Sequence, residues 1–307
     1  MIRIITYIVT FIFGITVSLA QVKSEEILLK NENIELPGTL TYIKKNSPLI
    51  IWVHGSGNVD RNGNQLPMIK ANYIKQFRDS INKKGIAFYS FDKRTATKKN
   101  MPSLLKGVKF MDYVSDIQKA ITYFKNDKRF TKIILLGHSQ GSLVAMLAAN
   151  NVDQFISVAG PSMSADKIII KQIQANAPFL DSITKAHFNE LSETGEVKEV
   201  NPMLVSIFAK QNQSFLSSWI QYKPSKEIKK LTIPTLIING DSDLQVKAKE
   251  AELLHEANPN STLVIIKKMN HVLKEVNSIT ENRSSYLKAE FPLSEKLIET
   301  IVNFVNQ

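Results

Sequence analysis

The sequence predicts an α/β fold in which a mostly parallel central sheet is flanked by helices. Short runs of consecutive apolar residues alternate with amphipathic stretches through residue 160, and the alternation returns after residue 230. The apolar runs lack a polar face, which is typical of strands buried on both sides of a parallel sheet. A sharp turn with Ser139 at its apex joins one such run to a helical run, which is the usual context of a reactive side chain in such folds.

The composition is that of an ordinary globular chain, with 43% hydrophobic and 22% charged residues and no cysteine. A chain of 307 residues is long enough to bury a core without disulfides. The net charge of +11 is scattered as short lysine pairs rather than gathered into one block. We therefore expect a solvated basic surface and no nucleic-acid partner. The oligomeric state is left open.

Residues 1–20 are predicted to be a signal peptide. Arg3 provides a short positive start, residues 4–17 are apolar or neutral, and residues 18–20 (Ser-Leu-Ala) fit a small-x-small cleavage site. The protein is therefore expected to be exported and to be periplasmic or extracellular. The alternative is an uncleaved membrane anchor, because the charge-free run continues to Val22.

Residues 21–160 and 231–307 are expected to form the sheet-containing core. Strands are predicted at 27–30, 39–44, 49–53, 86–91, 133–136, 155–159, 233–239 and 263–266, with a turn at Pro37-Gly38. Helices are predicted at 68–83, 110–124, 143–149, 246–257 and 293–305, and a loop at 95–107.

Residues 161–230 show only helical patterns and are predicted to be a helical cap inserted between two strands of the sheet. Predicted helices lie at 168–173, 179–191, 203–208 and 215–222. The segment carries several large apolar side chains, most of which we expect to pack onto the core while a few line a pocket. These are Phe179, Phe188, Met203, Phe208, Phe215 and Trp219.

The turn with the sequence Gly137-His138-Ser139-Gln140-Gly141 is predicted to present a nucleophile. The two glycines leave room where the turn brings strand and helix together, and Ser139 would sit at the apex with its hydroxyl exposed. The five-residue pattern alone has limited specificity, so its strand–turn–helix context and its partners decide the interpretation.

A serine hydroxyl needs a base within hydrogen-bond reach, and the base needs an orienting carboxylate. His271 is selected by elimination among five histidines, because it alone follows a strand on a loop near the C-terminus. The carboxylate is expected at the end of the preceding strand. Asp243 is preferred there, and Asp241 is the alternative.

An attacked carbonyl also needs N–H donors for the developing oxyanion. One donor is expected to be the backbone N–H of Gln140, the residue after the nucleophile. The other is expected in the loop His54-Gly55-Ser56-Gly57, where Ser56 is preferred and Gly57 is the alternative.

These motifs resemble the α/β-hydrolase superfamily, in its group of secreted serine esterases and serine aminopeptidase-like proteins. The similarity is greatest to bacterial carboxylesterases whose oxyanion loop reads Gly-Ser-Gly-x-x-Asp-Arg, as residues 55–61 do here. The order Ser139, Asp243, His271 is the one expected of that fold. The other shared motifs are residues 92–94 (Asp-Lys-Arg), 137–141, 240–246 and 270–271 (Asn-His). The chain departs from the pattern at Asn62 and Thr95, two loop positions that bear on substrate preference.

The resemblance implies hydrolysis of small-molecule carboxylic esters through an acyl-serine intermediate, with no cofactor. A peptidase or acyltransferase with the same three residues is an alternative, and a non-catalytic binding module on the same fold is another. No cysteine cluster or His-x-x-x-His pattern predicts a metal site, and no glycine-rich phosphate loop predicts a nucleotide site.

Overall fold

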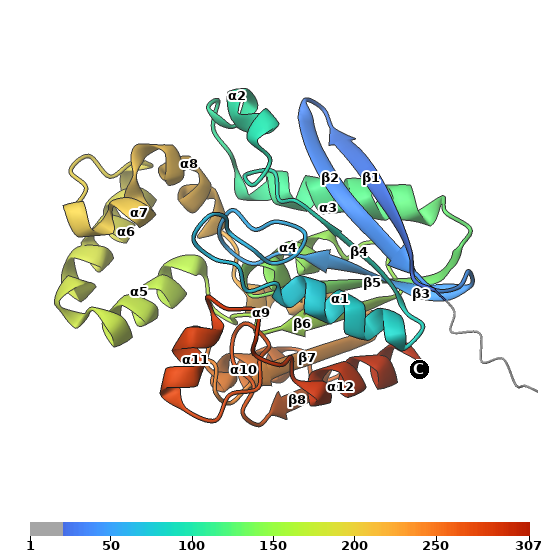
Figure 1. Ribbon diagram of the computed structural model, residues 1–307. Helices are drawn as coiled ribbons and strands as arrows, with labels where there is room; N and C mark the ends of the chain where they lie inside the picture. Colours follow the sequence, from blue (N-terminus) through green and yellow to red (C-terminus); the bar gives the residue numbers. More distant parts are fainter. Residues whose placement is uncertain (1–20) are drawn as a thin grey trace, which may run out of the picture.

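The computed structural model describes residues 21–307, through which one eight-stranded sheet runs (Figure 1). The predicted signal peptide, residues 1–20, lies outside the described residues. In space the strands follow the order β1-β2-β4-β3-β5-β6-β7-β8. Only the pairs β1–β2 and β2–β4 are antiparallel, so the prediction of a mostly parallel sheet is confirmed. The strands are β1 Lys23–Asn31, β2 Ile34–Tyr42, β3 Ser47–Val53, β4 Ala87–Phe91, β5 Phe130–His138, β6 Gln154–Val158, β7 Thr235–Gly240 and β8 Thr262–Ile266.

Helices cover both faces of the sheet. On one face, α1 (Tyr73–Lys83) and α12 (Glu295–Val305) pack over a core that includes Ile50 and Trp52 of β3. On the other face, α3 (Phe110–Lys125), α4 (Gln140–Ala148) and α10 (Ala248–Ala257) pack over a core that includes Leu49, Ile51 and Val53. Alternate side chains of one strand thus enter two different cores, which explains why the strand sequence is apolar without interruption.

The predicted turn at Pro37-Gly38 is wrong, because both residues lie inside β2. The chain reverses instead between β1 and β2, where Glu32 adopts φ 55°. A side chain at Gly38 would collide with the Tyr89 ring on β4, so this glycine permits a close approach of neighbouring strands rather than a turn.

The start of α1, the segment 95–107 and the segment before α12 also differ from the prediction. The helix predicted from residue 68 begins at Tyr73, because Asn72 has a left-handed backbone (φ 49°) and Gln65 and Ile69 pair in a short bridge before it. The predicted loop at 95–107 contains a 3-10 turn, Lys98–Asn100, and the short helix α2, Met101–Leu104. Near the C-terminus a further helix, α11, spans Ile279–Ser285.

Residues 161–230 contain helices and no strand, and Figure 1 shows them to one side of the sheet. The α-helices are α5 Ala165–Asn176, α6 Asp181–Thr194, α7 Val205–Phe208, α8 Lys210–Trp219 and α9 Pro224–Glu227; 3-10 turns lie at Pro178–Leu180, Pro202–Leu204 and Ile228–Lys230. The two ends of this helical segment meet, because the Ser225 N–H donates to the Ser162 carbonyl at 3.0 Å. The segment also has a small core of its own, formed by Leu180, Phe188, Leu191, Val197, Leu204, Phe208 and Leu216.

None of the helices in residues 21–307 combines the length and the apolar character needed to cross a lipid bilayer.

Candidate active site

Ser139 lies at the turn between β5 and α4, as predicted. Its backbone is strained, with φ 54° and ψ −123°, and its N–H donates to the Val158 carbonyl at 2.9 Å. Any side chain at Gly137 would collide with the backbone of Gly141, and any side chain at Gly141 would collide with the carbonyl of Val53. The glycines therefore allow the close contact of strand, turn and helix that presents Ser139 at the cavity wall.

Asp243 and His271 lie together beside this turn. Asp243 follows β7, His271 follows β8, and Asp243 Oδ2 lies 2.7 Å from His271 Nδ1. The other oxygen, Asp243 Oδ1, accepts the backbone N–H groups of Gln245 (2.8 Å) and Val246 (2.9 Å). The carboxylate is buried and accepts bonds on both oxygens, so it is well placed to fix the orientation of the imidazole.

Asp241, the alternative carboxylate, is exposed and has other partners. Its Oδ1 accepts the N–H of Lys268 and the hydroxyl of Ser242. It makes no hydrogen bond to His271.

The nucleophile turn and the His271 loop are joined by His138. Its Nε2 donates to the His271 carbonyl at 2.8 Å, and the two imidazole rings lie 4.9 Å apart between centroids. Burial, reinforced by the neighbouring His271, lowers the pKa of His138 to about 3, so this ring is neutral. Within residues 21–307 no hydrogen bond joins the Ser139 hydroxyl to His271. Such bonds often tighten only when substrate is bound.

The two preferred oxyanion donors line the same cavity as Ser139. Gln140 is the first residue of α4, so its N–H has no acceptor in the preceding turn of helix. In the part of the chain that the structure describes, neither the Ser56 N–H nor the Gln140 N–H finds a hydrogen-bond acceptor. The N–H of Gly57 is likewise without one, so Gly57 stays an alternative to Ser56.

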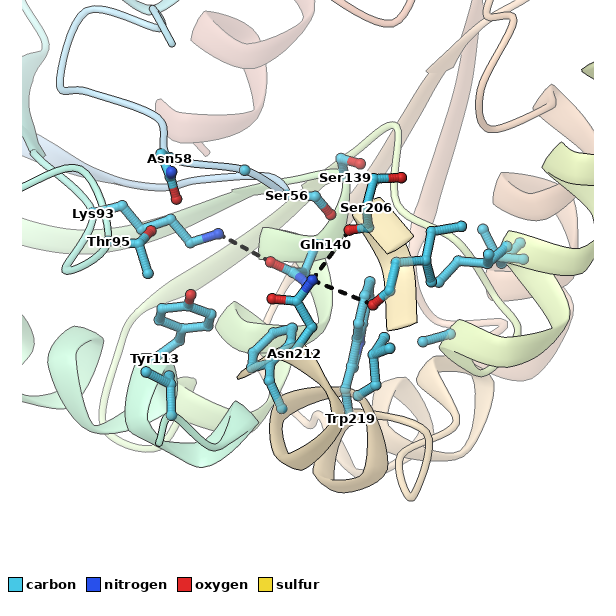
Figure 2. Close-up of a pocket in the computed structure, with 18 of the residues that line it drawn as sticks. Ser56, Asn58, Lys93, Thr95, Tyr113, Ser139, Gln140, Ser206, Asn212 and Trp219 are labelled. Atoms are coloured by element: carbon cyan, nitrogen blue, oxygen red, sulfur yellow. Dashed lines mark hydrogen bonds between the residues drawn. The ribbon is translucent and has the colours of Figure 1, made fainter. Parts of the chain in front are cut away.

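Lys93 is a polar residue of the site to which the sequence analysis assigned no role. It follows β4 and is only 6% exposed. Its Nζ donates to the Gly55 carbonyl at 2.8 Å and to Gln140 Oε1 at 3.1 Å, the second of which is drawn in Figure 2. Burial lowers the pKa of Lys93 to about 7, and the nearby carboxylate of Asp116 opposes that shift. The Asp-Lys-Arg motif at residues 92–94 was the sequence signal that could have identified Lys93 as a residue of the site.

The neighbours of Lys93 in that motif form ion pairs. Arg94 is bound by Asp116, with two contacts at 2.7 Å between side chains that are almost fully buried. Asp92 binds Arg61 at 2.9 Å. Asp60 takes part in no ion pair of the described residues; its carboxylate accepts the N–H groups of Asn62 and Asn64 and so shapes the loop after β3.

Ser139 opens into a cavity of about 780 Å³ between the sheet core and the helical segment. In Figure 2, Lys93, Thr95 and Tyr113 lie to the left of Gln140, Ser206 and Trp219 lie to its right, and Asn212 lies just below it. The wall is mostly apolar, and Lys93 is the one charged residue among the described residues that line it. Its apolar members include Met101, Leu104, Leu105, Leu143, Ile168, Ile169, Ile173, Phe215, Leu216 and Trp219.

The expectation that most of the large apolar side chains of the helical segment pack onto the sheet core is wrong, because only Phe215 and Trp219 of the six pack against it. Phe215 and Trp219 line the cavity, and Phe188 and Phe208 are buried in the segment's own core. Phe179 and Met203 do neither and are mostly exposed.

No group of three or more metal-type ligands comes together within residues 21–307.

The strand order and the Ser139 turn place the chain in the α/β-hydrolase superfamily, and similar solved structures have the same fold. Est1E from Butyrivibrio proteoclasticus matches with a TM-score of 0.60 at 18% identity, covering 92% of this chain and 99% of Est1E. The esterase Pf2001 from Pyrococcus furiosus matches with a TM-score of 0.59 at 16% identity, covering 92% and 91%.

More narrowly, the chain belongs to the BD-FAE family, whose model matches residues 39–257. A curated relative, the esterase EstD from Thermotoga maritima, is 27% identical over 252 residues. That match covers 78% of this chain but only 58% of EstD, so the chain spans little more than half of that relative. Two of these similar proteins, EstD and Pf2001, are named as esterases.

Proposed function

We propose that the protein is a serine hydrolase that cleaves carboxylic esters of small molecules. The observation that carries the proposal is the buried Asp243–His271 pair at 2.7 Å, set beside the strained turn of Ser139. In this mechanism Ser139 attacks the ester carbonyl while His271 takes the hydroxyl proton. His271 then gives the proton to the leaving alcohol, which leaves an acyl-serine. Water attacks the acyl carbonyl while His271 takes its proton, and His271 returns that proton to Ser139 Oγ as the bond to the acyl group breaks and the carboxylic acid leaves.

Asp243 holds His271 in the tautomer with a proton on Nδ1 and stabilises the imidazolium that forms. The N–H groups of Ser56 and Gln140 bind the carbonyl oxygen as it becomes an oxyanion. Support for this role comes from their lack of acceptors within the described residues and their place on the wall that holds Ser139.

The helical segment is proposed to act as a cap that forms the far wall of the substrate pocket. Its support is the set of cavity-lining residues from α5 and α8, among them Ile168, Ile173, Phe215 and Trp219. A cavity of this size with an apolar wall suits an acyl group larger than acetyl. A structure of Est1E holds ferulic acid, so an aromatic acyl ester belongs among the substrates tested.

The cavity favours an esterase over an aminopeptidase. A free peptide N-terminus is a cation and needs a carboxylate or a carbonyl cage. Lys93, the one charged residue that lines the cavity within residues 21–307, is basic. We therefore expect p-nitrophenyl acyl esters and methyl ferulate to be hydrolysed, and aminoacyl p-nitroanilides to be hydrolysed far more slowly.

The test is labelling of the purified protein with a fluorophosphonate probe. We expect wild-type protein to be labelled and Ser139→Ala to stay unlabelled. Ester turnover should fall by about 10⁴-fold or more in Ser139→Ala. Failure of the wild-type protein to react would favour a non-catalytic binding module, and labelling that survives Ser139→Ala would exclude Ser139 as the nucleophile.

We also propose that the protein is exported, on the strength of the signal-peptide pattern in residues 1–20. N-terminal sequencing of protein from a cell envelope or culture fluid should begin at Gln21. A mature chain that begins at Met1 would contradict cleavage.

A further inference from the structure

We propose that Lys93 is the positioning residue of the oxyanion hole, holding the Ser56 and Gln140 donors in their working orientation. The inference rests on the proposed function, because it presumes that those two N–H groups bind the oxyanion. Lys93 belongs to neither the nucleophile turn nor the loop after β3, yet its ammonium group lies between them and bonds to both.

The bond to Gly55 acts on the Ser56 donor directly. The Gly55 carbonyl and the Ser56 N–H belong to one peptide group, which is planar and trans here. In a trans peptide the C=O and the N–H point in opposite directions. Lys93 therefore directs the Ser56 N–H away from itself by holding the Gly55 oxygen at 2.8 Å, and its charge polarises the peptide so that the N–H is a stronger donor.

The bond to Gln140 acts on the second donor. Lys93 Nζ holds the Gln140 side-chain oxygen at 3.1 Å, at the first turn of α4. The backbone N–H of the same residue is the other proposed oxyanion donor. One ammonium group thus connects two segments that are more than 80 residues apart in the chain, and it sets the spacing between their donors.

The contacts of Lys93 suit a group that is held in place rather than one that moves. Its Nζ also lies over the ring of Tyr113, 4.4 Å from the ring centroid, so the aromatic face is a third partner beside the two hydrogen-bond acceptors. The titratable groups nearby are Tyr113 and Asp116 on α3 and His54 on the loop after β3. Asp116 is already neutralised by Arg94, and burial together with the Lys93 charge keeps His54 neutral.

Three variants test the proposal against esters of one acyl chain. Lys93→Met keeps the length of the side chain but removes its charge and its hydrogen-bond donors. Lys93→Arg keeps the charge and the donors. Lys99→Met is the control for loss of one positive charge, because Lys99 lies six residues further along and its side chain is 73% exposed. We expect kcat to fall by roughly 10- to 100-fold in Lys93→Met, with KM changed by less than about threefold, because oxyanion donors act in the transition state. Lys99→Met should match the wild type.

A trifluoromethyl ketone, which forms a tetrahedral oxyanion adduct on the nucleophile, gives a second readout. Its inhibition constant should rise in Lys93→Met by about the same factor as kcat/KM falls, because it mimics the transition state. A role in general stability would not produce this parallel.

The pH profile gives a third readout. Turnover should decline at alkaline pH in wild type and in Lys99→Met as Lys93 loses its proton, but it should decline much less in Lys93→Arg.

The outcomes separate this inference from the proposed function. If Lys93→Met has the same turnover, pH profile and inhibitor affinity as the wild type, the proposed role of Lys93 is wrong, while the proposed esterase function stands. A loss confined to KM would overturn the role of Lys93 as well. If Lys93→Met does not fold, the pH profile of Lys93→Arg decides. A smaller decline in turnover at alkaline pH than in wild type supports the role of Lys93, and an equal decline contradicts it. A wild-type protein that hydrolyses no ester removes the oxyanion hole and this inference with it.

Discussion

The Nε2–H of His138 donates a hydrogen bond to the backbone carbonyl of His271 across 2.8 Å. This bond ties the residue before the proposed nucleophile to the residue proposed as its base. The His138 ring is buried and also stacks on Trp52, with ring centroids 5.8 Å apart. The loop after β8 is therefore held to the end of β5, next to the proposed nucleophile and base.

Replacement of His138 by Phe should impair turnover without removing a reacting group. Phe retains the ring that packs against Trp52 but cannot donate to the His271 carbonyl. We expect kcat to fall by about 10-fold, because small displacements of a base cost rate steeply. Ester kinetics measure the effect, and His255→Phe on α10 is a control for the exchange itself. A kcat equal to wild type would show that the bond does not position His271.

The same substitution should also change the dependence of stability on acid. Burial lowers the pKa of His138 to about 3 from the usual 6.5, so between these values the unfolded chain binds a proton that the folded chain does not. His138 therefore destabilises the fold as the pH falls through this window. We expect the free energy of unfolding, measured with urea at pH 7 and pH 4.5, to drop less in His138→Phe than in wild type. Equal drops would contradict the neutral, buried state of His138.

The two aspartates after β7 should differ sharply in their effect on rate. Asp243→Asn removes the charge opposite His271 and disturbs its tautomer, which should lower kcat by about 10³- to 10⁴-fold. Asp241→Asn, two residues away on the same turn, should leave kcat within about twofold because that carboxylate is exposed. Steady-state ester hydrolysis by both variants decides the matter. A larger loss in Asp241→Asn would reverse the assignment.

The buried pair of Arg94 and Asp116 should matter for stability more than for chemistry. Arg94→Met leaves the Asp116 carboxylate buried and unpaired, which should cost about 3–5 kcal/mol in the free energy of unfolding. The double variant Arg94→Met/Asp116→Leu should recover much of that loss, because it removes the stranded charge. Urea unfolding of the three proteins measures both effects. A double variant as unstable as Arg94→Met would mean that lost packing, not charge burial, sets the cost.

One wall of the cavity can be tested by filling it. Ile168→Trp on α5 introduces bulk at a residue that lines the cavity. We expect kcat/KM for octanoyl esters to fall at least about 10-fold relative to acetyl esters, because the longer chain loses its space. Ile170→Trp is the matched control, since Ile170 lies on the same helix but outside this cavity. Equal losses for both acyl lengths would place the acyl group elsewhere.

Much of the core could be predicted because its strands are buried on both faces. Runs such as 49–53 and 86–89 are apolar without a break, and a covered parallel strand tolerates that pattern. The residues of the site could be proposed for a related reason: loops at the carboxyl ends of parallel strands gather at one edge. Ser139, Asp243 and His271 each follow such a strand.

Other features depend on contacts that the local sequence does not encode. Lys93 stands in a charged triplet that suggests a solvated loop, and its two acceptors lie 38 and 47 residues away in the chain. Pro37-Gly38 has strong turn chemistry, but the space that Gly38 leaves for the Tyr89 ring decided its place inside a strand. The contact of His138 with His271 could not be predicted, because its acceptor is a backbone carbonyl, which no side-chain pattern indicates.

The helices between β6 and β7 enclose hydrophobic contacts largely separate from those that stabilise the sheet, and the chain enters and leaves them through the joined ends at Ser162 and Ser225. Such an arrangement is modular. Segments of different length or shape could be grafted between these two serines while the strand edges that carry the reacting groups keep their register. Under the proposed function, exchange of this segment is a route to new acyl preferences that leaves Ser139, Asp243 and His271 in place.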